Sequence, residues 1–307
     1  MHVELIGKTF PVYNNAKECL PLDIINSGLV VATAAAKQCY NSGDFNYSDF
    51  VLPIIEKNLS PNGKANTYDD SVYKLAWKIA TTSGHTSILE HASATFLISG
   101  VSRALSHQLV RHRIASYTQQ SQRYVDLSEA SYVVPKTIKD TEDISVYSLY
   151  KSGIENSFHI YSELVKKLVQ AGYTEQQARE DARYVLPNAC TTQLVMTMNY
   201  RELGDFLGKR LCTRAQWEIR ELAQKIFGIM EASKNDSIIF NRKTGVYKGP
   251  KCLNKGYCDE AKSCGISKKL TELTTSPVSD TKQKPVEEKN HSPTGWKTRC
   301  LGLFRRN

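Results

Sequence analysis

The residues best suited to chemistry stand together between Arg103 and Arg123, a stretch that ends in RHRIASYTQQSQRY. It is rich in Arg, His, Ser and Gln and holds no Asp or Glu. Like charges repel by about 1 kcal/mol or more per close pair, so an arriving anion would relieve the cluster. Arg offers paired planar donors that suit phosphate, and Ser and Gln suit the edge of a base. The stretch therefore predicts a site for an anionic ligand.

Residue types alone leave three interpretations of this stretch open. It could be a solvated basic helix followed by a polar loop, a compact nucleotide or dinucleotide pocket, or a strip that binds RNA. An RNA strip should interleave aromatic stacking surfaces with the charges. Only Tyr117 and Tyr124 qualify, which favours a compact pocket.

The same stretch resembles the signature of the flavin-dependent thymidylate synthases, Arg-His-Arg followed after seven residues by Ser. Here these residues are Arg111, His112, Arg113 and Ser121. Four further blocks match in the family's order: GHTSILEH at 84–91, ARYVLP at 182–187, MNYREL at 198–203 and KRLCTRAQWEIR at 209–220. The resemblance implies a homotetrameric enzyme that carries a methylene group from methylenetetrahydrofolate to dUMP. It then reduces that group to the methyl of dTMP, with FAD as cofactor and NADPH as reductant.

The resemblance also implies which residues contact FAD. The GHTS block matters here, because an isolated His is more often a packed or surface residue than a ligand. At position 205, where the family is expected to carry His or Asn, this chain has Asp205. That carboxylate either points away from the flavin or takes another hydrogen-bonding role, unless the match slips locally. The implied FAD contacts are His85, Ser87, Arg111, His112, Arg113, Gln119, Asn199, Tyr200, Arg201 and Asp205.

A second set of residues is implied for dUMP. Its phosphate is expected at Arg123 and Arg183, and not at the neighbouring Arg179. Ser121 is expected to position dUMP, because a Ser nucleophile needs an adjacent base and nothing in the sequence places one beside it. The full dUMP set is Gln108, Leu109, Val110, Arg111, Gln119, Gln120, Ser121, Gln122, Arg123, Arg183 and Arg210.

Arg210 is the residue that the resemblance places in catalysis, against the uracil ring. A fixed positive charge there lowers the cost of negative charge on N3 and O4, and so polarises the ring without a covalent enzyme nucleophile. The simpler alternative is an ion pair between Arg210 and Glu218 or Glu221 on the following helix.

Helical periodicity places these residues on a set of helices. We expect one helix from Ser71 to just before Gly84 and another capped by Ser102, which would carry Arg103, His107 and Arg111 on one face. Three more are expected at about 155–171, from Thr174 with Gln177 completing a capping box, and after Thr213.

Two stretches alternate as strands do, HASATFLI at 91–98 and QLVMTMN at 193–199. Helices and strands do not alternate regularly enough for a doubly wound parallel sheet. The sequence therefore predicts an α+β fold in which a mixed or antiparallel sheet packs with helices.

Composition bounds the remaining possibilities for the 307 residues. A hydrophobic share of 41% excludes disorder for the bulk of the chain. No apolar run approaches the roughly 20 residues that span a bilayer, and the N-terminus lacks a signal-peptide pattern, so we expect a cytoplasmic protein. Of the net charge of +9, most lies in 250–307, with 12 Lys and Arg against 6 Asp and Glu.

The chain is predicted to comprise a catalytic domain at 1–249, a Cys-containing extension at 250–265 and a disordered basic tail at 266–307. Cys252, Cys258 and Cys264 are spaced six apart within the extension, with no CxxC pair. Structural zinc usually shows tighter pairs and four ligands, so unliganded thiols are the favoured interpretation and no metal is expected.

Overall fold

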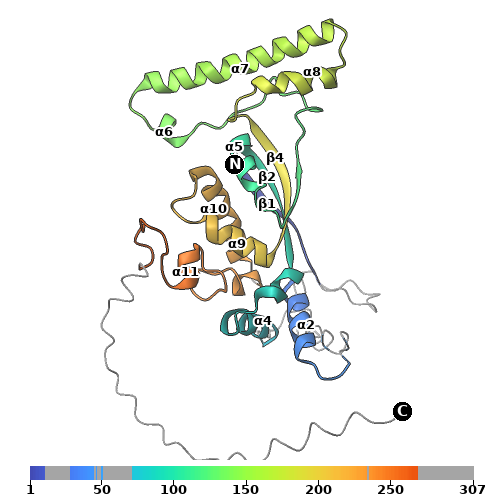
Figure 1. The fold of residues 1–307 in the computed structure, drawn as a ribbon, viewed down its shortest axis with the longest axis vertical. Helices are drawn as coiled ribbons and strands as arrows, with labels where there is room; N and C mark the ends of the chain where they lie inside the picture. The colour runs from blue at the N-terminus through green and yellow to red at the C-terminus, as the bar shows by residue number, and fades with distance from the viewer. Residues whose placement is uncertain (11–27, 45, 47–49, 51–70, 234, 269–307) are drawn as a thin grey trace, which may run out of the picture. The chain divides into compact units, whose positions relative to one another are not determined.

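A four-stranded antiparallel sheet organises the fold in the order β1-β2-β4-β3 (Figure 1). The computed structural model describes residues 1–10, 28–44, 46, 50, 71–233 and 235–268. The strands are β1 (His2–Lys8), β2 (Ser93–Ser102), β3 (Ser116–Gln119) and β4 (Thr191–Asn199). Both predicted strands are present, and the α+β class with an antiparallel sheet is confirmed.

Alternation of side chains gives the central pair of strands one buried face. Opposite residues on that face include Phe96 with Met196 and Ile98 with Leu194, and all four are buried. They belong to one core that also contains residues of α9 (Tyr200–Arg210) and α10 (Trp217–Ala232). Because each fully buried side chain of this size contributes about 1.5–3 kcal/mol, the sheet is stable only with these helices in place.

The remaining helices form two groups. Contacts join α2 (Gly28–Tyr40), α4 (Ser71–Thr82) and η1 (Thr86–His91) to one another. Farther along the chain, α7 (Ile144–Gln170) and α8 (Glu175–Ala182) lie side by side (Figure 1). The short elements are α5 (Arg103–Leu109), α6 (Lys136–Lys139), η2 (Arg183–Val185), η3 (Asp236–Ile238) and α11 (Lys251–Lys255).

The helix boundaries follow from local capping, which confirms some predictions and corrects others. The box between Thr174 and Gln177 opens α8 as expected. The start predicted near residue 155 is wrong, because Asp143 accepts from the Ser145 main-chain N–H and α7 already begins at Ile144. The expected start after Thr213 also shifts, since the Gln216 side chain caps α10.

The signature segment is less helical than the sequence suggests. Ser102 caps α5 as predicted, but the helix ends at Leu109, so Arg111 lies beyond it and does not share a helix face with Arg103. The Tyr117 hydroxyl lies between the main-chain oxygens of Leu109 and His112, at 2.9 and 3.0 Å, and its single O–H is shared between these two acceptors at the end of the helix. The chain then turns and forms β3, a strand that the sequence analysis did not predict.

Contacts gather Met1–Leu270 into one compact unit, so the catalytic domain and the extension are described together. The expected tail at 266–307 falls almost wholly on residues outside those described. None of the helices in the described ranges has the length and apolar character needed to cross a membrane.

Candidate active site

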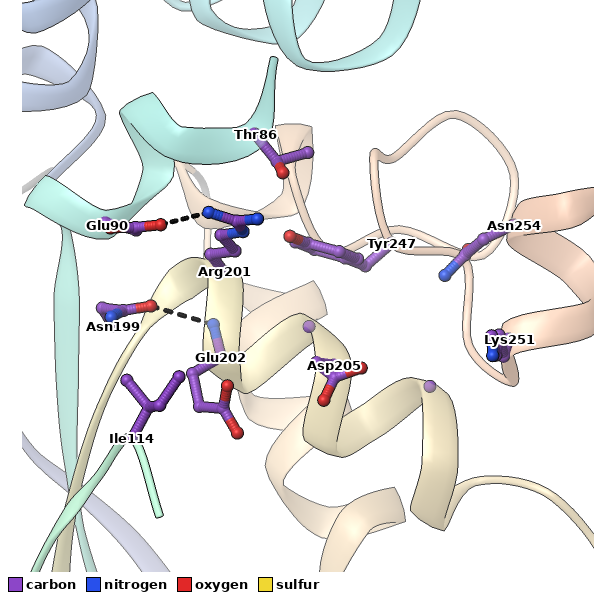
Figure 2. A pocket seen from close by; sticks show the side chains of 12 residues that line it. Thr86, Glu90, Ile114, Asn199, Arg201, Glu202, Asp205, Tyr247, Lys251 and Asn254 are labelled. Carbon is purple, nitrogen blue, oxygen red and sulfur yellow. Dashed lines mark hydrogen bonds and ion pairs between the residues drawn. The ribbon is translucent and has the colours of Figure 1, made fainter. Parts of the chain in front are cut away.

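A half-open pocket of about 500 Å³ lies where α9, η1 and the 247–254 segment meet (Figure 2). Three residues from the predicted FAD set line it: Asn199, Arg201 and Asp205. Thr86 lines the opposite side and is the neighbour in sequence of both His85 and Ser87. The fold thus brings two sequence blocks about a hundred residues apart to one cavity.

The junction of β4 and α9 explains why these side chains meet. Asn199 ends the strand in an extended conformation, and its side-chain oxygen accepts from the Glu202 main-chain N–H at 2.8 Å. An Asn in this position satisfies a free N–H group of the first turn and starts the helix there. As a result Arg201, Glu202 and Asp205 follow the strand end directly and all line the pocket.

Ion pairs already occupy three of the charged groups in the pocket. Arg201 pairs with Glu90 of η1, and Asp205 pairs with Lys209 one turn along α9. In Figure 2, Arg201 and Tyr247 point toward one another across the cavity. The Asp205 carboxylate is therefore partly neutralised within its own helix, which answers how a negative charge is tolerated at this place.

Gly204 lets Tyr247 pack flat against the first turns of α9. A Cβ atom at Gly204 would lie 2.2 Å from Cζ of Tyr247, far inside any contact distance. The other side of the Tyr247 ring stacks on Phe240, with ring centroids 5.5 Å apart. Burial raises the pKa of Tyr247, so its hydroxyl stays protonated across the physiological range. Tyr247 thus forms a fixed wall of the pocket.

Arg210 ends α9 and is held by a histidine. Its Nε donates to Nε2 of His112 at 3.1 Å. On the other side of that imidazole, Nδ1 lies 3.7 Å from Oε1 of Glu202. Burial first, and then the charge of Arg210, lower the pKa of His112 to about 4. A neutral imidazole, 6% exposed as a residue, therefore sits between a carboxylate and a guanidinium.

The alternative partners proposed for Arg210 are Glu218 and Glu221, and Glu218 bonds to another residue. The Glu218 carboxylate accepts from the main-chain N–H of Ser102 at 2.7 Å and from its hydroxyl at 2.5 Å. Within the described part of the chain, neither Glu218 nor Glu221 forms an ion pair with Arg210.

The predicted dUMP loop is anchored by the sheet. Gln119 donates from its amide to the hydroxyls of Ser106 and Thr192, both at 3.1 Å. Ser121 accepts from the Arg123 main-chain N–H at 3.1 Å, an arrangement typical of a turn. The His112 side chain faces Arg210 and Glu202, so this histidine is not placed as a base for Ser121.

The cluster is not free of carboxylates, which corrects the expectation drawn from residues 103–123. Glu180 of α8 forms an ion pair with Arg123 at 2.8 Å. The Nε of Arg183 donates to the main-chain oxygen of Glu180 at 3.1 Å. The two expected phosphate ligands therefore converge on Glu180, which neutralises one of them.

The other predicted residues differ in how their side chains are placed. His85, Ser87, Arg111 and Arg113 are exposed, and no ion pair involves these two arginines within the described ranges. Gln108 and Gln122 are half-buried, and Val110 is exposed. The main-chain N–H of Gln120 donates to the main-chain oxygen of Gln193 at 3.0 Å.

Two predicted contacts can involve only the main chain. The Leu109 side chain is fully buried in the core. Tyr200 is also fully buried, and its hydroxyl donates to Asp236 at 2.7 Å. Tyr200 therefore supports α9 from the core side, with its ring directed away from the pocket.

A second cavity, also about 500 Å³, adjoins Arg210 and is lined by four thiols, those of Cys212, Cys252, Cys258 and Cys264. Burial raises the pKa of Cys252, and the other three thiols add to this effect. Over the described residues, no group of three or more His, Cys, Asp or Glu side chains is arranged to hold a metal ion. Unliganded thiols remain our prediction.

Sequence reasoning missed Glu90, Glu202 and Tyr247 as parts of the site. Glu90 and Glu202 stand inside the GHTSILEH and MNYREL blocks, so their position next to matched residues was an available signal. Tyr247 lies outside every matched block, and only the fold brings it to the pocket.

Comparison with known proteins relates the chain to one group. The family described as Thymidylate synthase complementing protein matches residues 23–233. The flavin-dependent thymidylate synthase of Clostridium tetani is 41% identical over 276 residues, which cover 87% of this chain and 98% of the relative. That of Pyrococcus furiosus is 47% identical over 181 residues, covering 58% of this chain and 69% of the relative.

Among solved structures, Thymidylate Synthase X (ThyX) from Helicobacter pylori with FAD and dUMP matches with a TM-score of 0.50 and 23% identity. The match covers 82% of this chain and 99% of that one, and at this identity it shows the fold. None of these proteins is described as binding RNA, so the RNA-binding alternative gains no support.

Proposed function

This chain belongs to the flavin-dependent thymidylate synthase family, and we propose that the pocket between η1 and α9 is where it binds FAD. The enzyme converts dUMP to dTMP, with methylenetetrahydrofolate as the carbon donor and NADPH as the reductant. The observation that carries the site assignment is the convergence of Asn199, Arg201 and Asp205 with the GHTS block on one cavity.

The residues of the pocket suit a large, partly aromatic cofactor. Asn199 and Thr86 offer polar groups, and Tyr247 offers a flat wall. Arg201 and Lys251 offer positive charge beside three carboxylates, those of Glu90, Glu202 and Asp205, so the phosphates of the cofactor need further cations from outside this lining. Pockets for such ligands combine apolar walls with a few placed polar groups in this way. FAD, when bound and reduced by NADPH, would supply the hydride that reduces the transferred methylene group.

Arg111 and Arg113 are proposed as ligands of the FAD phosphates. Both are exposed next to Ile114, which itself lines the pocket. Guanidinium groups without a carboxylate partner are ready to bind phosphate bidentately. His85 and Ser87 stay in the proposed FAD set as the sequence neighbours of Thr86, and Gln119 stays in it on the family resemblance alone.

The loop from Gln119 to Arg123, with Arg183, is proposed to bind dUMP. Arg123 and Arg183 meet at Glu180, so a dUMP phosphate would compete with that carboxylate for Arg123. Ser121 is proposed to hold the nucleotide, and its replacement by Ala should lower activity without abolishing it. Complete loss of activity with dUMP still bound would instead favour a nucleophilic role.

Arg210 is proposed as the catalytic residue. Only its Nε is used by the protein in the described part of the chain, which leaves both terminal nitrogens for a ligand. Placed at the uracil ring, they would stabilise negative charge developing on N3 and O4. Gln108, Val110, Arg111 and the main chain of Leu109 complete the proposed dUMP set, and they would lie around the nucleotide together with Gln120 and Gln122 of the loop.

We also propose that the enzyme works as a homotetramer in the cytoplasm. Large apolar side chains stand exposed on this chain, among them Ile144 at 81%, Leu149 at 78%, Tyr184 at 84% and Ile114 at 66%. Exposed apolar side chains of this size are typical of surfaces that a partner covers. Sedimentation of the purified protein tests the assembly directly.

The reaction is tested by release of tritium from dUMP labelled at C5. We expect release that requires FAD and increases with NADPH and methylenetetrahydrofolate together. Purified protein should carry visible flavin absorbance. A colourless protein that releases no tritium and binds RNA in a salt-sensitive way would reject the proposal.

A further inference from the structure

Three side chains of α9 form a stripe that faces His112. Glu202, Phe206 and Arg210 are four residues apart, so they lie on one face of the helix. The His112 ring meets that of Phe206 edge to face, with centroids 5.0 Å apart and planes at 81°. Its side chain is 5% exposed. His112 is therefore packed against the whole length of the stripe.

The hydrogen bond to Arg210 defines the tautomer of His112. An arginine Nε–H can only donate, so Nε2 of His112 must carry the free lone pair. The proton of the neutral ring is then on Nδ1, which lies 3.7 Å from Oε1 of Glu202. This separation exceeds a direct hydrogen bond, but the carboxylate still favours a proton on that nitrogen.

The charges around His112 keep it neutral. Burial, Arg210 and Lys209 lower its pKa to about 4, whereas Asp205 acts in the opposite direction. Glu202 faces Nδ1, and burial raises the pKa of that carboxyl. From the other packed element, Tyr117 contacts only the main-chain oxygen of His112. Nε2 therefore remains an acceptor throughout the neutral range.

We propose that His112 is a positioning residue for Arg210, with Glu202 holding its tautomer, and that its side chain does not contact FAD. This inference deepens the proposed function and rests on it. We infer no side-chain contact with FAD because the His112 ring is buried against α9 and cannot also face an open pocket.

The bond to His112 leaves the outer edge of the Arg210 guanidinium available to a ligand. His112 takes the Nε–H of Arg210, and the described residues supply no acceptor for its two terminal nitrogens. A ligand can then meet that pair of nitrogens bidentately. Holding a long side chain in place before the ligand arrives also reduces the entropy lost on binding.

Two substitutions at His112 separate this role from a cofactor contact. His112→Phe keeps a ring against Phe206 but removes the acceptor, and His112→Gln restores an acceptor oxygen. With the FAD-loaded enzyme, we expect His112→Phe to weaken dUMP binding about 10-fold or more, as for a lost hydrogen bond to a charged group. His112→Gln should stay within about 3-fold, and both should retain FAD. His159→Phe, on the exposed side of α7, is the control.

Glu202 is tested through its coupling to His112. Glu202→Gln should weaken dUMP binding by about 2- to 5-fold in the wild-type background and have no further effect in His112→Phe. Glu175→Gln, at the exposed start of α8, should change nothing. Independent, additive effects of the two substitutions would overturn the assignment of Glu202.

A pH series on wild type and His112→Gln tests the neutral state of His112 even if His112→Phe does not fold. The ratio of dUMP affinities of wild type and His112→Gln should be constant between about pH 5.5 and 8, because titration of the dUMP phosphate cancels. A ratio that falls as His112 gains a proton near its ordinary pKa would overturn the proposal.

Two further results would also overturn it: loss of FAD from both variants, or unchanged dUMP affinity in His112→Phe. The failure of the proposed function looks different, because the wild-type enzyme would then hold no flavin and release no tritium.

Discussion

Replacing Gly204 with Ala tests how tightly the pocket wall is built. The new Cβ would lie 2.2–2.3 Å from three ring atoms of Tyr247. That ring cannot simply swing aside, because Phe240 stacks on its other face. Either α9 or the 247–254 segment must move, and both line the proposed FAD pocket.

The expected cost follows from two opposing effects. Inserting a methyl group into packed surroundings typically costs about 1–3 kcal/mol. Replacing a helical Gly by Ala gains about 1 kcal/mol in helix propensity. Gly228 of α10 isolates the second effect, since a Cβ there meets nothing within 4 Å. Gly204→Ala should therefore be less stable than Gly228→Ala by about 1–3 kcal/mol.

Urea unfolding of both variants at one protein concentration gives this difference, and flavin absorbance after purification gives FAD retention. We expect Gly204→Ala to lose FAD and Gly228→Ala to keep it. Equal stability and equal flavin content in the two variants would refute the packing argument. Partial recovery of FAD in a Gly204→Ala, Tyr247→Ala double variant would support it.

Three further predictions concern stability. Between about pH 6.5 and 4, His112 is protonated in the unfolded chain but not in the folded chain. The free energy of unfolding should therefore fall by up to about 1 kcal/mol per pH unit as the pH is lowered through this range. His112→Gln should show a shallower slope in urea unfolding, and identical slopes would contradict this. Glu218→Gln should cost about 1–3 kcal/mol, because one of the two Ser102 donors then faces an amide N–H₂ group; a thermal shift of zero would count against it. Thr174→Ala should cost about 1 kcal/mol by removing the capping box, seen as faster amide exchange at the start of α8 and not elsewhere.

Periodicity and capping made much of the fold predictable. The alternating residues of β2 and β4 identified both central strands, and Thr174 with Gln177 identified the start of α8. The start of α7 was missed because the apolar side chains of its first turns, such as Ile144 at 81% exposure and Leu149 at 78%, are exposed and do not form the buried face by which the rest of the helix was recognised. Only the Asp143 cap signals that boundary.

The candidate site was predictable where chemistry is local in sequence. Asn199 and Arg201 stand two residues apart in one block and line one pocket. Glu180 was not predictable as the partner of Arg123, because α8 reaches the cluster only through tertiary packing. Likewise, nothing in the sequence indicated that the His112 ring packs against Phe206 of α9, which is the contact behind the positioning role that we propose for it.

The pairing of β2 with β4 sets when the site can form. Ser93 lies opposite Asn199, so about a hundred residues must be synthesised and looped before the central ladder closes. Closing a loop of that length costs about 4 kcal/mol of chain entropy. Such non-local pairing is slow, and α9 follows it in the chain. In a growing polypeptide the proposed FAD pocket therefore cannot form until α9 has left the ribosome. β1 can pair with β2 earlier, but the edge of β2 that faces β4 must wait unpaired until β4 emerges.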